Sequence, residues 1–179
     1  HFSDGATSYG IQDPSFFKYR ACFADIDNDG DLDLFLVNWI AISNKLLRND
    51  GGAFTDITAQ SGLATVNKYS TYACFGDYDN DGFVDLFVAN RASTNDANGY
   101  DILYHNEGNG TFSDVTATMG VAGPAGEKTI AAAWADFDNQ MSEDFSSHPQ
   151  CDVCSTPKAD ISRRLWNVRF VPKADIGLI

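Results

Sequence analysis

Two nine-residue segments carry carboxylates at the same intervals. The first runs from Asp25 to Asp33 as D-I-D-N-D-G-D-L-D, and the second runs from Asp77 to Asp85 as D-Y-D-N-D-G-F-V-D. Two carboxylates about 4 Å apart repel by roughly 4 kcal/mol at an effective dielectric near 20, so a compact loop with several of them requires a cation. Aspartates, a backbone carbonyl and a glycine for the sharp turn suit a hard ion that prefers oxygen ligands, and calcium fits best.

The two loops belong to a longer repeat. The triplet F-[S/T]-D begins at Phe2, Phe54 and Phe112, so it recurs after 52 and then after 58 residues. The first loop aspartate recurs after 52 and 59 residues, at Asp25, Asp77 and Asp136. Because independent markers share one period, the chain consists of two tandem units and the beginning of a third.

Short apolar segments surround each loop and must position it. They are rich in aromatic residues, leucine and β-branched residues, and Gly, Asn and Asp separate them. The expected strands cover 21–24, 34–39, 45–48 and 54–58 in the first unit, and 72–76, 86–89, 102–105 and 112–116 in the second. No segment before residue 139 has a helical apolar period. These features predict an all-β fold: a partial β-propeller of two four-stranded blades, part of a third, and an irregular tail.

The pattern stops within the third unit. Gln140 and Met141 stand where the third loop is expected to have Asp and Gly. Residues 1–139 hold 20 acidic and 7 basic residues, whereas residues 140–179 hold five of each. We therefore expect propeller blades over 1–139 and an unrelated, poorly ordered tail over 140–179. The alternative is a native extension that covers the open edge of the last sheet.

Residues 1–139 resemble the FG-GAP/VCBS repeats of calcium-binding β-propellers. The phrases A-C-F-G-D-Y-D-N-D-G at 73–82 and N-E-G-N-G-T-F-S-D-V-T at 106–116 are most similar to the ASPIC/UnbV and cartilage-acidic-protein-like branch. In that family each loop joins two strands of a blade and holds one calcium ion. Closed propellers need at least about four blades, so the resemblance implies a truncated propeller.

The resemblance also implies the ligands of two calcium sites. The first site would use the side chains of Asp25, Asp27, Asp29 and Asp33 with the carbonyl of Asp31. The second site would use the side chains of Asp77, Asp79, Asp81 and Asp85 with the carbonyl of Phe83. Asp136 and Asp138 match only the first two ligand positions, so a third site is degenerate.

Two other interpretations of the acidic loops fit less well. An EF-hand needs Glu at loop position 12, where this chain has Leu36 and Val88, and it needs helices on both sides. An enzyme needs a catalytic constellation, and no G-x-S-x-G, H-E-x-x-H or phosphate loop is present. His105, which stands where the first unit has Arg48, is interpreted as a surface residue at a strand end. The sequence therefore predicts no enzyme.

Cysteine and tryptophan leave three further alternatives open. Cys22 and Cys74 each precede a loop by three residues, which indicates small buried strand residues; a disulfide between them stays possible. Cys151 and Cys154, preceded by His148, form a lone C-x-x-C that is a weak zinc signal. Trp39, Trp134 and Trp166 could form a carbohydrate platform, but the first two lie in repeated strand segments and favour core packing.

Charge and hydropathy restrict the partners. The net charge of −13 argues against nucleic acid or an anionic membrane as partner, and no apolar run is long enough for membrane insertion. We expect a calcium-binding propeller-repeat fragment of an adhesion or recognition protein with a protein or carbohydrate ligand. Calcium at millimolar levels places it outside the cell, in the periplasm or on the cell surface. The alternative is a calcium-dependent lectin-like module or an accessory domain of a polysaccharide-active enzyme.

Overall fold

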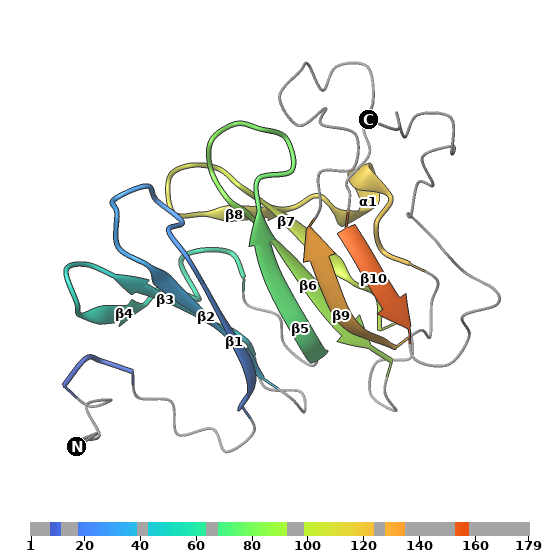
Figure 1. The fold of residues 1–179 in the computed structure, drawn as a ribbon, viewed down its shortest axis with the longest axis horizontal. Helices are drawn as coiled ribbons and strands as arrows, with labels where there is room; N and C mark the ends of the chain where they lie inside the picture. The colour runs from blue at the N-terminus through green and yellow to red at the C-terminus, as the bar shows by residue number, and fades with distance from the viewer. Residues whose placement is uncertain are drawn as a thin grey trace, which may run out of the picture.

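In the computed structural model, the secondary structure of the described residues is nearly all β-strand (Figure 1). The structure describes residues 8–11, 18–38, 43–63, 68–92, 99–123, 128–134 and 153–157. Within these residues there are two four-stranded sheets, one two-stranded sheet and a single helix of one turn. The predicted all-β class with two four-stranded blades is therefore confirmed.

The first repeat unit forms one antiparallel sheet with the strand order β1-β2-β3-β4. Its strands are β1 (Lys18–Ala24), β2 (Asp33–Asn38), β3 (Lys45–Asn49) and β4 (Phe54–Asp56). Each strand pairs with the next along the chain, so the acidic loop at 25–32 is the turn between β1 and β2.

The second unit repeats this order as β5-β6-β7-β8. Its strands are β5 (Tyr69–Gly76), β6 (Asp85–Arg91), β7 (Ile102–Asn106) and β8 (Phe112–Asp114). The acidic loop at 77–84 again joins the first two strands. A short helix, α1 (Thr116–Met119), follows β8 and ends at Gly120 with φ 68°. The sequence pattern did not predict α1, because four residues are too few to show a helical period.

The third unit contributes β9 (Thr129–Trp134), which pairs antiparallel with β10 (Val153–Pro157). Five residues of the predicted tail, 153–157, therefore form a strand beside the third unit. Pairing with β10 satisfies backbone groups of β9 that an open sheet edge would leave unpaired. Asp136 and Asp138 lie outside the described residues, as does all of 140–179 apart from β10, so the division at residue 139 stays a prediction.

Apolar side chains fill both interfaces between the successive sheets. Side chains alternate along a strand, so β6 directs Leu86 and Val88 to one face and Phe87 and Ala89 to the other. The first pair packs in a cluster with residues of the first sheet, including Phe35, and the second pair packs with residues that include Ala132 of β9. This two-sided burial explains why the segment Asp85–Asn90 of β6 is buried throughout.

Trp134 packs in the interface between the second sheet and β9. Its Nε1 donates a hydrogen bond to the carbonyl of Cys74 at 3.3 Å. A Cβ atom at Gly76 would lie 2.5 Å from Cγ of Trp134, so the ring needs a glycine beneath it. This arrangement supports core packing of Trp134 rather than a carbohydrate platform. Trp39 and Trp166 lie outside the described residues.

A buried polar contact joins each sheet to the next at the end away from the acidic loops. Asn44, just before β3, donates from Nδ2 to Oγ of Ser70 in β5 at 2.9 Å. One repeat later, Asp101, just before β7, accepts from Oγ1 of Thr129 in β9 at 2.7 Å. All four side chains are buried. The contact therefore recurs between equivalent positions of adjacent units.

We expect Asn44→Ala to lower the free energy of unfolding by about 1–3 kcal/mol, because buried polar groups lose their partner. Asn44 also accepts a hydrogen bond from the Asn38 backbone N–H at 2.9 Å. A double-mutant cycle with Ser70→Ala, measured by urea denaturation, should give a coupling energy of about 1 kcal/mol. Thr55→Ala, at an exposed site in β4, is the control and should change stability by less than about 0.5 kcal/mol. Strict additivity of the two substitutions would show that the inter-sheet contact contributes nothing.

Cys22 and Cys74 are free, half-buried thiols. Burial raises the pKa of Cys74 to about 12, and burial together with the nearby Cys74 raises the pKa of Cys22 to about 12. At pH 8 both thiols should react with iodoacetamide about a thousandfold more slowly in the folded protein than in urea, because the thiolate is the nucleophile. Mass spectrometry of the two cysteine peptides measures this ratio. Rates within tenfold of each other would contradict the burial of these thiols.

Candidate metal centres

The two acidic loops have the same backbone conformation. Asn28 and Asn80 have positive φ angles of 59° and 58°, and the following Gly30 and Gly82 have φ angles of 94° and 92°. Asn tolerates the left-handed region better than most residues, and Gly adopts it without strain. The sequence N-D-G therefore bends both loops in the same way and turns the side chains at loop positions 1, 3 and 5 toward one another.

The first aspartate of each loop holds this bend in place. Asp25 accepts hydrogen bonds from the backbone N–H groups of Asp29 at 3.1 Å and Gly30 at 3.0 Å. In the second loop, Asp77 accepts the equivalent bonds at 3.2 Å and 3.0 Å. These bonds satisfy loop donors that no strand partner reaches, and they fix the carboxylate inside the turn.

The last aspartate of each loop is completely buried at the base of the sheet. Asp33 accepts from the N–H groups of Ile26 at 2.9 Å and Asn49 at 2.7 Å. Asp85 likewise accepts from Tyr78 at 2.9 Å and Asn106 at 2.8 Å. Each carboxylate thus ties the start of its loop to the end of the third strand of the same sheet.

Three groups of side chains could each hold a divalent cation. Within each group, the possible ligand atoms lie within 4.8 Å of one another. The groups are Asp25, Asp27 and Asp29; Asp77, Asp79 and Asp81; and Asp79, Asp85 and His105. The structure therefore brings together the expected ligands at loop positions 1, 3 and 5 in both loops, and it places Asp85 beside the second group.

The remaining expected ligands are not part of these groups. Asp33 lies outside the first group, where both of its oxygens accept backbone hydrogen bonds. Asp31 uses Oδ2 to accept from the N–H of Gly51 at 2.8 Å. The carbonyl ligands expected at Asp31 and Phe83 stay predictions.

One carboxylate oxygen in each loop is buried without a partner. Oδ1 of Asp27 and Oδ1 of Asp79 are shielded from solvent, and no donor among the described residues makes a hydrogen bond to either atom. Leaving a buried acceptor unsatisfied costs about 1–3 kcal/mol, and more when the group is charged. The two atoms occupy the same loop position. The donor set and these two oxygens therefore fit a bound cation in each loop.

Burial disfavours the charged form of these carboxylates. Burial raises the pKa of Asp27 and Asp33 in the first loop and of Asp79 in the second. Repulsion from a neighbouring carboxylate raises the pKa further, chiefly from Asp29 for Asp27 and from Asp81 for Asp79. Burial raises the pKa of Asp85 to about 6, although backbone N–H groups and His105 oppose the shift. A divalent cation reverses this balance because it stabilises every nearby carboxylate in its charged form.

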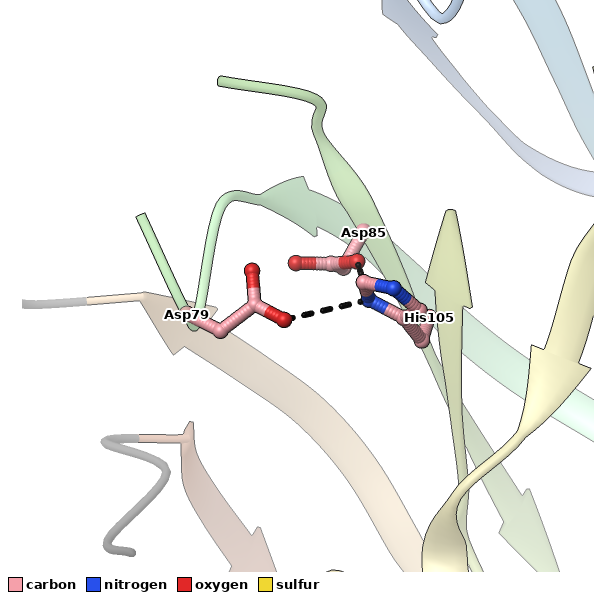
Figure 2. Close-up of side chains that lie close together, drawn as sticks. All are labelled: Asp79, Asp85 and His105. Atoms are coloured by element: carbon pink, nitrogen blue, oxygen red, sulfur yellow. Dashed lines mark hydrogen bonds and ion pairs between the residues drawn. The ribbon is translucent and has the colours of Figure 1, made fainter. Parts of the chain in front are cut away.

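His105 lies against the second loop rather than on the surface. Its side chain is only 21% exposed, and Nδ1 is 3.2 Å from Oδ1 of Asp85 and 3.3 Å from Oδ2 of Asp79 (Figure 2). The interpretation as a surface residue at a strand end is therefore wrong. The pairing of β7 with β6 carries His105 beneath the loop that precedes β6. Arg48, at the equivalent position of the first sheet, instead binds Asp50 at 3.0 Å.

Successive four-stranded antiparallel sheets, each with an acidic loop between its first two strands, define a propeller-type repeat protein. Comparison with known families agrees. The model of the FG-GAP-like repeat matches residues 25–88 and again residues 77–140. The chain belongs to the FG-GAP-like repeat family. No curated protein matches the sequence. Among the described residues, no helix has the length and apolar character that crossing a membrane requires.

The raised pKa values predict how the stability of metal-stripped protein depends on pH. The folded state holds a proton on Asp85 up to about pH 6, whereas the unfolded chain releases it near pH 3.8. The contribution of Asp85 to stability is therefore fully present below about pH 3.8 and is lost as the pH rises to about 6, by an amount on the order of 1–3 kcal/mol. Urea denaturation after EDTA treatment and gel filtration measures this loss. Asp85→Asn should flatten the profile, and stability that increases steadily over this range would contradict the assignment.

Proposed function

We propose that this chain is a calcium-binding propeller-repeat segment of a protein that recognises partners outside the cytoplasm. Calcium ions in the two acidic loops would stabilise the blades. The observation that carries this proposal is the buried, unpartnered carboxylate oxygen of Asp27 and its exact counterpart in Asp79. A single unsatisfied oxygen would only lower the stability of the fold. The same unsatisfied oxygen at the same position of two repeats indicates a common ligand.

The ligand atoms favour calcium among the common divalent ions. In the first loop the cation would be held by Asp25, Asp27 and Asp29, which supply only oxygen. Calcium accepts six to eight oxygen ligands in flexible geometry, whereas magnesium demands a near-ideal octahedron and retains waters. As the family resemblance implies, Asp33 and the Asp31 carbonyl would complete the first site. The ion would supply positive charge that offsets carboxylate repulsion, and it would perform no reaction.

Calcium in these loops would also strengthen the junction between blades. Nδ2 of Asn28 in the first loop donates to the carbonyl of Gly82 in the second loop at 3.0 Å. Nδ2 of Asn106, at the end of β7, donates to the carbonyl of Ile26 at 2.8 Å. Ordering one loop therefore orders acceptors and donors that belong to the neighbouring blade.

The proposed role is structural and recognitional, without catalysis. The first and last loop aspartates hold the turns through backbone hydrogen bonds, and a cation bound by the clustered carboxylates would keep them ionised. The partner would be a protein or a carbohydrate, and the setting extracellular, periplasmic or on the cell surface. The phrases at 73–82 and 106–116 favour the ASPIC/UnbV branch of the family. A lectin-like module is the alternative, although Trp134 is committed to packing against Gly76.

Calcium titration of the full chain tests the proposal. We expect two calcium ions per chain by isothermal titration calorimetry, and stabilisation of about 2.7 kcal/mol per site at a hundredfold excess over Kd. Asp27→Ala should remove or strongly weaken one site and leave the other. Glu107→Ala, which removes an exposed carboxylate outside the clusters, is the control and should retain both sites. Wild-type protein that neither binds calcium nor gains thermal stability from it would refute the proposal.

A further inference from the structure

The two loops differ at one position that faces the carboxylates. Arg48 in β3 and His105 in β7 each precede the asparagine whose N–H binds the last loop aspartate. Arg48 brings a fixed positive charge and offers no ligand atom. His105 brings a ring nitrogen, and that nitrogen lies between two carboxylates. The second loop therefore has a mixed nitrogen and oxygen donor set, which the first loop lacks.

The geometry around Nδ1 of His105 suits a shared ion better than hydrogen bonding alone. Nδ1 carries at most one hydrogen, yet it lies 3.2 Å from Oδ1 of Asp85 and 3.3 Å from Oδ2 of Asp79 (Figure 2). One N–H cannot give a full hydrogen bond to both oxygens. Ligand atoms held about 2.0–2.1 Å from a tetrahedral zinc ion are separated by roughly 3.3 Å. The observed separations already match that value.

The surrounding residues hold these three side chains in position. Asp85 is completely buried and is fixed by the N–H groups of Tyr78 and Asn106. The Tyr78 ring meets the imidazole edge to face, with centroids 5.9 Å apart and an interplanar angle of 74°. Oδ2 of Asp81 lies 4.0 Å from Nε2 of His105.

The unpartnered oxygen described above for the second loop belongs to a member of this group. Oδ1 of Asp79 is shielded from solvent, and the described part of the chain supplies no hydrogen bond to it. The carboxylate that carries this atom is the one whose other oxygen approaches His105. An ion bound by Asp79 would give this oxygen a partner, whereas both oxygens of Asp85 already accept backbone hydrogen bonds.

We propose that Asp79, Asp85 and His105 form a site for a borderline divalent transition metal of the Zn²⁺ class. Imidazole suits zinc and related ions, whereas calcium takes oxygen ligands. The inference rests on the proposed role of the loops as cation sites, and it assigns a different preferred cation to each loop. The first loop is selective for calcium, and the second loop accepts Zn²⁺ in preference to calcium.

Zinc titration of the full chain in 2 mM calcium tests this division. Cys151→Ser and Cys154→Ser are introduced in every sample, so that the C-x-x-C thiols cannot bind the metal. We expect one Zn²⁺ per chain by calorimetry. His105→Arg, which gives the second loop the residue of the first, should weaken zinc binding at least tenfold. His105→Gln is a second variant in case the arginine disturbs folding. Arg48→Ala is the matched control and should leave the zinc affinity within twofold of its original value.

Calcium titration of the same variants separates the two proposals. The first loop should bind calcium equally in His105→Arg and in the parent, which also shows that the variant is folded. Zinc affinity unchanged in both His105 variants, or no zinc bound in calcium, would overturn this inference while two calcium sites uphold the proposed function. Calcium binding at neither loop, with zinc binding that depends on His105, would refute the proposed function and leave the zinc site standing.

Discussion

A buried negative charge at the base of each acidic loop is the constraint on which the rest of the structure depends. Asp33 and Asp85 are fully enclosed, and each joins the first residues of its loop to the last residue of the third strand. Burying a carboxylate is costly unless hydrogen bonds and positive charge compensate for it. The surrounding backbone provides the hydrogen bonds. The need for positive charge explains why other ligand atoms, and in one blade a histidine, gather at the same end of the sheet.

The sheets themselves follow from the need to cover both faces of a blade. Strand β6 points Leu86 and Val88 to one face of its sheet and Phe87 and Ala89 to the other, so one sheet alone cannot bury them all. Stacking successive sheets solves this problem, and it brings the acidic loops of adjacent blades close enough for Asn28 to reach Gly82. The core and the loops are therefore parts of one arrangement rather than independent features.

Local signals in the sequence predicted the strands and the loops. The period of the repeats located both four-stranded sheets, and N-D-G with its flanking aspartates located both turns. Features that depend on contacts between strands were not predicted. His105 appeared to be a surface residue because its sequence neighbours say nothing about the loop that precedes β6. The alignment of Arg48 with His105 was the available signal, since a repeat places equivalent residues beneath equivalent loops. β10 lies in the segment that does not share the period of the blades, so periodicity could not reveal it. The short helix α1 has a counterpart in the first unit, where the Ser61 N–H donates to the Ile57 carbonyl as the Met119 N–H donates to the Val115 carbonyl, but one turn is too short to show a helical period.

The polar contacts from Asn44 to Ser70 and from Asp101 to Thr129 run only between consecutive sheets, and all pairing within the two four-stranded sheets joins strands adjacent in the chain. Such a molecule has no need to wait for its carboxyl-terminal half before it begins to fold. Each folded four-stranded sheet can provide the surface on which the next sheet packs after it leaves the ribosome. Gene duplication of one unit could then lengthen the array while every existing neighbour keeps its contacts.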